Sequence, residues 1–204
     1  MEIKTLTDIY MDENTYFIVE NGKSIVIDPG SEAKDILAFA GDIEIKYIFL
    51  THCHYDHMKG VNELREKTGA LVCATSECAE NIKRPEINLS GAWLKNDIII
   101  ENTGIILTEE NDFEFEGIKI KTIKTPGHTN CSACFMVENN LFAGDTLFLQ
   151  TTGRWDLPTG DENTLRKSIR EKLYTLDEGI DVYPGHGKKT SIGYEKKFNF
   201  LVRE

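Results

Sequence analysis

The sequence predicts an α/β fold in which two β-sheets carry helices on their outer sides. In the first half of the chain, apolar strand candidates alternate with segments of helical spacing. In the second half, short strand candidates follow one another in hairpin fashion before helical segments return. Because 204 residues with 40% hydrophobic content suit one core, we expect a single domain over residues 1–204.

The first half contains two strands around a turn, then a helix, a strand and a second helix. Strands are expected at 16–19 and 24–27, on either side of Asn21-Gly22, and Asp28-Pro29-Gly30 ends the second. A helix should follow from Ser31, as N-cap, to Ala40. The apolar run 45–50 is typical of a strand buried on both faces, and 58–67 has helical spacing before Gly69.

The second half is expected to form a run of strands followed by helices. The strand candidates are 105–107, 113–115, 118–125, 133–137, 141–143 and 180–182, and the helix candidates are 161–173 and 191–198. Glu116-Gly117 joins two of these strands as a hairpin turn. Residues 83–102 have no strong period and predict no regular element beyond a short helix.

All five histidines fall in short segments suited to metal ligation. These are His52, His54 and His57 in Thr51-His-Cys-His-Tyr-Asp-His57, His128 in Pro126-Gly-His-Thr129, and His186 in Pro184-Gly-His-Gly187. With Asp56 and Asp145 they make seven donors, which is enough for two divalent ions. A structural zinc site would need four ligands rich in cysteine, so this set favours catalysis.

Local geometry explains how one short segment could serve two ions. Residues two apart in an extended chain project to the same side, so His52 and His54 can bind one ion while Cys53 points away. Asp56 and His57 follow where the chain turns, and can face a second ion. The other ligands, His128, Asp145 and His186, follow predicted strands, which indicates an open cleft at one sheet edge.

Such a centre would hydrolyse its substrate without a serine or cysteine nucleophile. Two ions about 3.5 to 4 Å apart can lower the pKa of a shared water to about 7, which yields a metal-bound hydroxide at neutral pH. The ions also stabilise the oxyanion that forms when hydroxide attacks a carbonyl. We expect Asp56 and Asp145 to be the carboxylates of this catalytic centre.

The ligand pattern His-x-His-x-Asp-His, followed by a separate His, Asp and His, resembles the metallo-β-lactamase superfamily. The resemblance covers about residues 15–199 and implies a four-layer αββα sandwich. It also implies that His52, His54 and His128 hold one ion, that Asp56, His57 and His186 hold the other, and that Asp145 bridges them. Asp28, in Asp28-Pro-Gly30, matches the turn that buttresses such a site.

Three further segments look most similar to glyoxalase II and its short bacterial hydroxyacylglutathione hydrolase relatives. They are Thr125-Pro-Gly-His-Thr129, Phe142-Ala-Gly-Asp-Thr-Leu-Phe148 and Gly153-Arg-Trp-Asp-Leu-Pro-Thr-Gly160. This resemblance implies hydrolysis of a thioester such as S-D-lactoylglutathione or a related small acyl compound. Full-length glyoxalase II carries a helical C-terminal extension that binds glutathione, and this sequence is expected to lack it.

The same fold also supports an oxidoreductase alternative. Persulfide dioxygenases share a Gly-Arg-x-Asp turn and hold a single iron through two histidines and one aspartate. The complete second ligand set, with His186, argues against that alternative. The seven donors suit two ions, Zn first, with Fe or Mn as alternatives, because His and Asp ligands accept all three.

Several residues near the ligands keep two interpretations. Arg154 could line the cleft or pair structurally with Asp156 or Asp161, with pairing favoured. Tyr55, inside the ligand segment, could line the cleft or simply pack. Cys131 and Cys134 form a Cys-x-x-Cys pair, for which packing as buried thiols is favoured over a redox or zinc role.

Composition narrows the partners to small molecules. The net charge is −11 and no Lys or Arg run could follow a phosphate backbone, so nucleic acid is not expected. Neither an apolar signal segment nor a membrane span is recognisable. Five cysteines without a secretory signal suit a reducing compartment, so we expect a cytoplasmic protein. The sequence leaves the oligomeric state open.

Overall fold

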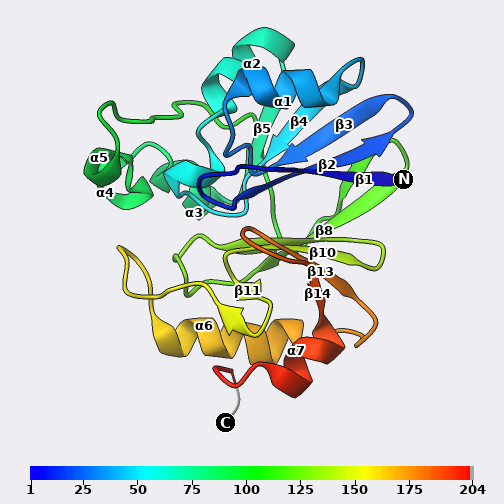
Figure 1. Cartoon of the computed structure of the whole chain (residues 1–204), viewed down its shortest axis with the longest axis vertical. Coiled ribbons are helices and arrows are strands. Elements are labelled where there is room, and N and C mark those ends of the chain that lie inside the picture. The colour runs from blue at the N-terminus through cyan, green and yellow to red at the C-terminus, as the bar shows by residue number, and fades with distance from the viewer. Residues whose placement is uncertain (203–204) are drawn as a thin grey trace. The chain divides into compact units, whose positions relative to one another are not determined.

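The computed structural model describes residues 1–202 and divides the chain into two compact units, residues 1–107 and residues from 108 onward. Each unit contains one six-stranded sheet (Figure 1). Two mixed sheets with helices agree with the α/β fold that the sequence predicts. The expectation of a single domain stays a prediction.

The first unit is built on a sheet that changes from antiparallel to parallel pairing. Its strands, in sheet order, are β1 (Glu2–Thr7), β2 (Asn14–Glu20), β3 (Lys23–Ile27), β4 (Glu44–Phe49), β5 (Leu71–Ala74) and β6 (Ile105–Ile106). β1, β2 and β3 pair antiparallel, whereas β3 to β6 pair parallel. The helices are α1 (Ala33–Ala40), α2 (Val61–Thr68), α3 (Ser76–Asn81), α4 (Pro85–Asn88) and α5 (Ser90–Trp93).

The predicted turn at Asn21-Gly22 forms and sets the register of β2 against β3. Both residues have positive φ, 51° and 74°, as a two-residue hairpin turn requires. The register places Ile18 opposite Ile25 and Phe17 opposite Val26, and all four side chains are buried in the core of this unit. Because successive residues of a strand point to opposite faces of the sheet, the hairpin is covered on both faces.

Two helix starts differ from the sequence-based expectation. α1 begins at Ala33 with Glu32 as N-cap, because Ser31 is buried one residue upstream, where its carbonyl faces Gly60. The second helix begins at Val61 rather than Met58, because Tyr55–His57 form a separate 3-10 turn. Its end is as predicted, with Gly69 in the left-handed conformation after Thr68.

The predicted strand at 45–50 forms as β4, yet only its second half is buried on both faces. Glu44 and Lys46 are exposed and form an ion pair at 3.0 Å, whereas Ile48 and Phe49 are fully buried. The strand thus emerges from solvent at its start and reaches the core at its carboxyl end. That end leads directly into the histidine segment.

The second unit contains a sheet in which a hairpin run meets one parallel pair. Its strands, in sheet order, are β14 (Thr190–Ser191), β13 (Asp181–Pro184), β10 (Asn140–Gly144), β9 (Ala133–Val137), β8 (Ile118–Lys124) and β7 (Phe113–Phe115). Only β10 and β13 pair parallel. The strands β11 (Leu147–Phe148) and β12 (Thr151–Thr152) form a separate two-stranded hairpin. The helical segments are α6 (Glu162–Ser168), a π-helical turn (Ile169–Leu173) and α7 (Ile192–Phe198).

Helix α6 supports the loop that carries His128. Gly127 packs so closely on this helix that a Cβ added to it would lie 2.2 Å from the Leu165 backbone. Ser168 donates a hydrogen bond from Oγ to the Pro126 carbonyl at 2.7 Å, and the Asp161 amide donates to the Gly127 carbonyl at 2.8 Å. The glycine before His128 is therefore required by close packing.

Several elements were not anticipated from the sequence. β1, β5, β14 and the β11–β12 hairpin are short or half-exposed and lack a long apolar run. The segment 83–102, for which only a short helix was considered, contains the two single-turn helices α4 and α5. Among the described residues no helix has the length and apolar character needed to cross a membrane.

We predict that Leu165→Ala destabilises the second unit by about 2–5 kcal/mol, since it removes a fully buried side chain from the core cluster. Lys167→Ala, on the exposed face of the same helix, should stay within about 0.5 kcal/mol of the parent protein. Urea unfolding monitored by circular dichroism measures both. A loss below about 1 kcal/mol for Leu165→Ala would contradict the packing described.

Candidate metal centre

The histidine segment lies at the carboxyl end of the buried part of β4. His52, His54 and His57 are all buried, with exposed fractions of 1%, 3% and 0%. The ring centroids of His52 and His54 are 4.8 Å apart, and those of His52 and His57 are 4.2 Å apart. Three imidazoles this close suit a shared cationic ligand far better than independent packing roles.

Asp28 is the hydrogen-bonding hub of this segment. Its Oδ1 accepts a bond from the Thr51 amide at 2.8 Å, and its Oδ2 accepts from Thr51 Oγ1 at 2.5 Å. The same Oδ2 lies 3.1 Å from His57 Nδ1, and Thr51 Oγ1 lies 3.0 Å from His52 Nδ1. Because the Thr51 hydroxyl donates to Asp28, it can accept from His52, so one carboxylate orients two imidazoles.

This network fixes which ring nitrogen faces a metal. Nδ1–H of His57 and of His52 each have an acceptor, which assigns the proton to Nδ1 and leaves the Nε2 lone pair for a ligand. Asp28 already accepts from three donors, so we interpret it as the support of the ligands and not as a ligand itself. These contacts agree with the buttressing role expected for it.

Asp28 has a backbone φ of 50°, a left-handed conformation that a non-glycine residue adopts at some cost. Aspartate and asparagine tolerate this region better than other residues with a side chain. The Asp28 amide is held by the Phe49 carbonyl at 2.9 Å, which fastens the turn after β3 to the end of β4. The conformation is therefore imposed by its neighbours on both strands.

Asp56 follows on the 3-10 turn, half-buried, with Oδ2 3.9 Å from His57 Nε2. Gly30 allows this turn to approach, because a Cβ on it would lie 1.9 Å from the Asp56 carbonyl oxygen and 2.4 Å from Glu13 Oε2. Burial raises the pKa of Glu13 well above its usual value, and the nearby Asp28 and Asp56 add to the rise while His57 opposes it. Burial, with Asp56, also raises the pKa of Tyr55.

The second unit brings its three predicted ligands together around Asp145. Oδ2 of Asp145 lies 3.6 Å from His128 Nε2 and 3.7 Å from His186 Nε2. His128 is 2% exposed, whereas Asp145 and His186 are partly accessible. One carboxylate oxygen thus lies near two imidazoles, and the bridging role expected for Asp145 stays a prediction.

The segment after the β11–β12 hairpin holds His128 in place. His128 Nδ1 lies 2.6 Å from the Arg154 carbonyl oxygen, which again leaves Nε2 for a metal. Gly153 permits this contact, because a Cβ there would lie 1.9 Å from the Asp145 carbonyl oxygen.

The Arg154 side chain is exposed and pairs with Asp156 through Nε and Nη2, both at 2.7 Å. The favoured structural pairing of Arg154 is confirmed, and that ion pair lowers the pKa of Asp156 to about 2.

Glu195, which sequence reasoning missed, anchors that hairpin from α7. This carboxylate is fully buried and accepts bonds from the Gln150 amide at 2.9 Å, Thr190 Oγ1 at 2.6 Å and Asn199 Nδ2 at 3.0 Å. Asn199 Nδ2 also donates to the Thr151 carbonyl at 2.9 Å. The sequence offered only a weak indication of this role, namely that Glu195 and Asn199 are four residues apart near the end of an amphipathic helix.

The structure therefore places four predicted ligands together in the first unit and three in the second. In the first unit these are His52, His54, Asp56 and His57, and in the second they are His128, Asp145 and His186. These imidazoles and carboxylates are donors that zinc, iron and manganese ions accept. In addition, three of the rings have a hydrogen-bond acceptor at Nδ1, which leaves their Nε2 atoms for an ion. All five cysteines are buried free thiols, and Cys131 and Cys134 contact different threonines, Thr129 and Thr125.

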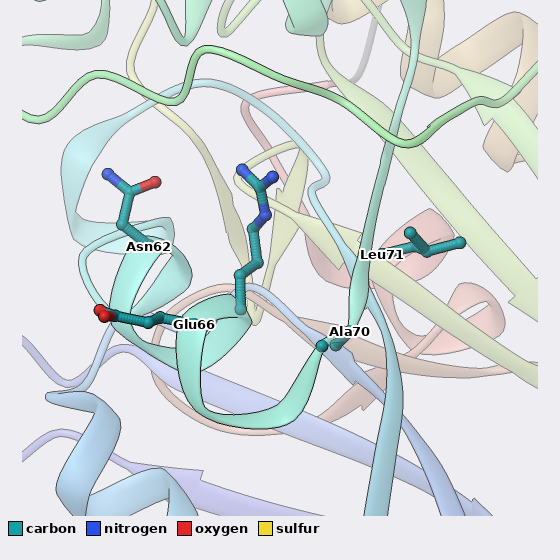
Figure 2. A pocket seen from close by; sticks show the side chains of 6 residues that line it. Asn62, Glu66, Ala70 and Leu71 are labelled. Carbon is teal, nitrogen blue, oxygen red and sulfur yellow. The ribbon is translucent and has the colours of Figure 1, made fainter.

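A separate hollow of about 350 Å³ in the first unit has no part in this arrangement (Figure 2). Asn62 and Glu66 border it from α2, and Ala70 and Leu71 from the start of β5. Asn62 Nδ2 donates to the Ile99 carbonyl at 2.9 Å, which ties the segment after α5 to α2. Nothing that could ligate a metal or act as a nucleophile lines it apart from Glu66, so we interpret it as a surface groove.

Comparison with known proteins identifies the class. Residues 11–186 match the description of the metallo-β-lactamase superfamily. A probable metallo-hydrolase from Streptococcus pyogenes serotype M6 is 36% identical, with 96% of this chain and 88% of that protein covered. The hydroxyacylglutathione hydrolase GloC of Haemophilus influenzae is 30% identical, with 98% and 97% covered. This chain belongs to the metallo-β-lactamase superfamily.

Two solved structures extend the comparison. The B3 metallo-β-lactamase BLEG-1 has a TM-score of 0.93 at 28% identity, with 100% of both chains covered. TTHA1623, crystallised in a di-iron-bound form, has a TM-score of 0.85 at 27% identity, with 97% of this chain and 99% of that one covered. Together with the relatives, they support a probable metal-dependent hydrolase with His and Asp metal sites.

We predict that Asp28→Asn lowers metal affinity by about 10- to 100-fold, because the amide cannot accept from all three donors that the carboxylate serves. Asparagine tolerates a φ of 50°, so the turn should persist. Competition with a chromophoric chelator measures the affinity. Asp35→Asn, on exposed α1, is the control, and equal affinities in both variants would refute the hub role of Asp28.

We predict that Glu195→Ala loosens the β11–β12 hairpin and lowers stability by about 1–3 kcal/mol, because it leaves the Gln150 amide and Asn199 without their buried acceptor. Amide exchange at residues 150–154 should accelerate more than elsewhere in the second unit. Glu178→Gln, an exposed carboxylate paired with Lys196, is the matched control. Uniform protection in both variants would show that Glu195 does not hold the hairpin.

Proposed function

We propose that this protein is a binuclear metal-dependent hydrolase that acts on a thioester such as S-D-lactoylglutathione, or on a related small acyl compound. The seven proposed ligands are those of the two units taken together. His52, His54 and His128 would hold one ion, Asp56, His57 and His186 the other, and Asp145 would bridge. Zn is the first candidate, and the di-iron form of TTHA1623 supports Fe as an alternative.

The observation that carries the proposal is the orientation of the imidazoles. His52, His57 and His128 each have an acceptor at Nδ1, namely Thr51 Oγ1, Asp28 and the Arg154 carbonyl. Each ring is thereby held in the tautomer whose Nε2 can coordinate a cation. Packing alone would not require the same tautomer at three positions in two different units.

When bound, two ions supply a Lewis acid for the substrate carbonyl and acidify a water molecule. The residues of the chain orient that chemistry. Asp145, whose Oδ2 lies 3.6 Å from His128 Nε2 and 3.7 Å from His186 Nε2, would be the carboxylate shared by the two ions. Asp56 is the carboxylate next to His57 and, being half-buried, is reachable by a substrate. Asp28 holds the proton on Nδ1 of His57 throughout.

A thioester is preferred to other acyl compounds on two grounds. The segments around His128, Asp145 and Arg154 resemble those of glyoxalase II, which hydrolyses the thioester S-D-lactoylglutathione. GloC, 30% identical over nearly the full length of both chains, is a hydroxyacylglutathione hydrolase. We also propose a small-molecule substrate and a cytoplasmic location, because five free buried thiols suit a reducing compartment.

We predict about two metal ions per chain and turnover of S-D-lactoylglutathione or another acyl thioester by the purified protein. Asp145→Asn should lower kcat/KM by at least about 100-fold, since it weakens both ion sites and the stabilisation of the oxyanion. Asp112→Asn, on an exposed loop of the same unit, is the control. Metal analysis and a thiol-release assay with lactoyl, acyl-CoA and lactone substrates measure the outcome.

Less than about one metal per chain, or no turnover of any ester or thioester, would overturn the proposal. The persulfide dioxygenase alternative is disfavoured, because a single iron site would not need His186, whose Nε2 lies 3.7 Å from Asp145. Oxygen consumption by iron-loaded protein with glutathione persulfide would decide for that alternative.

A further inference from the structure

Two buried threonine hydroxyls join the segment that carries Asp145 to the segment that carries His128. Thr125 Oγ1 lies 2.8 Å from Thr146 Oγ1, and the two side chains are 0% and 1% exposed. Thr146 directly follows Asp145 in the chain, and Thr125 precedes His128 by three residues. The contact is therefore made close in the chain to two proposed ligands, whose atoms Oδ2 and Nε2 are 3.6 Å apart.

This hydroxyl pair belongs to a closed ring of hydrogen bonds at the ends of three strands. Thr125 Oγ1, just after β8, also lies 3.4 Å from the Sγ of Cys134 on β9. The Cys134 thiol donates to the Ala143 carbonyl on β10 at 3.6 Å, and the Thr146 amide donates to the same carbonyl at 3.1 Å. The ring fixes Thr146, and with it the chain at Asp145, relative to the ends of β8 and β9.

The opposite flank of Asp145 is held by the main chain. The Gly144 carbonyl accepts a hydrogen bond from the Gly185 amide at 2.8 Å, which attaches this segment to the residue before His186. Oδ2 of Asp145 lies 3.7 Å from His186 Nε2. A main-chain contact persists when side chains change, whereas the contact on the His128 side depends on two hydroxyl groups.

A hydroxyl pair holds two segments closer together than apolar packing can. Hydroxyl oxygens that share a proton lie about 2.7–2.8 Å apart, whereas carbon atoms in contact stay about 3.5–4.0 Å apart. Replacing both hydroxyls by methyl groups would therefore move the two segments apart by roughly 1 Å. A functional site needs its groups within about 0.5 Å of their productive positions, so a shift of this size would disturb a metal centre.

We propose that Thr125 and Thr146 are positioning residues of the metal centre, and that the hydrogen bond between them sets the spacing of His128 and Asp145. The inference rests on the proposed function, because it takes His128 and Asp145 as ligands. The two threonines act through these ligands, and neither is itself a ligand. Their hydroxyls determine how tightly the metal is held, independently of which substrate is hydrolysed.

Valine substitutions separate positioning from a contribution to stability alone. Each single variant, Thr125→Val or Thr146→Val, leaves one buried hydroxyl without its partner, so its urea midpoint should fall in metal-free protein. The double variant has neither hydroxyl, and its urea midpoint should return towards that of the parent protein. Its zinc affinity, measured by competition with a chromophoric chelator, should nevertheless stay about 10- to 100-fold below the parent value.

A spectroscopic measurement reports the ligand geometry directly. The visible absorption of cobalt-loaded protein depends on the arrangement of the ligands, so it should change in the double valine variant. Thr122→Val, which alters a buried threonine of β8, is the matched control, and it should keep the parent spectrum and the parent zinc affinity. Thr125→Ser and Thr146→Ser retain the hydroxyl and should keep them as well.

Two outcomes would overturn the inference. One is a double valine variant that has both the urea midpoint and the zinc affinity of the parent protein. The other is a folded serine variant that loses as much zinc affinity as the corresponding valine variant. In either case the parent protein still binds metal, so the proposed function stands. A parent protein that binds no metal refutes the proposed function instead.

Discussion

The hydrogen bonds to Asp28 are the constraint on which the first half of the site depends. One carboxylate ends β3, accepts from the residue that follows β4, and fixes the proton on His57 Nδ1. Because β3 and β4 are parallel neighbours in the middle of a sheet, both reach Asp28 at their carboxyl ends. The ligand segment is thus attached to the buried carboxyl ends of two neighbouring strands, which hold its position.

The second unit reaches the same result by a different route. At Nδ1 of His128 the acceptor is a backbone carbonyl, that of Arg154, which takes the part that Asp28 plays for His57. The position of the Arg154 carbonyl depends on the position of the segment after the β11–β12 hairpin. This is why the buried Glu195 and Asn199 matter, since they fasten the preceding hairpin to α7. The first unit relies on a side chain and the second on tertiary anchoring of a loop.

Local patterns predicted the α/β fold well, because strands, helices and hairpin turns leave regular traces in the sequence, whereas the ligand assignments stay predictions. The Asn21-Gly22 turn was predictable, since Asn and Gly both tolerate positive φ, and Gly117 marked the second hairpin turn, where Glu116 also adopts a positive φ of 47°. The histidines were predictable because their spacing follows strand geometry. The helix start at Ala33 was not, because the burial of Ser31 against Gly60 depends on a distant segment.

What the sequence could not disclose were contacts between residues far apart in the chain. Glu13 precedes the metal segment by some forty positions and belongs to no motif, yet its carboxylate shares space with Asp56. Glu195 resembles any solvated helical glutamate until α7 is placed on the hairpin. Short strands such as β5 were equally hidden, because pairing with neighbours, and not a long apolar run, makes them strands.

The two glycines that face ligand carbonyls, Gly30 and Gly153, have a consequence for how this protein can diversify. Each leaves less than 2 Å between its missing Cβ and the carbonyl oxygen of an aspartate, Asp56 or Asp145. Any side chain there would displace the backbone that carries a proposed ligand. By contrast, the tip of the β1–β2 turn, where Ile9 and Tyr10 are 86% and 87% exposed, can take new side chains without such a clash. Sequence change is therefore sterically easier at this turn than beside the proposed ligands.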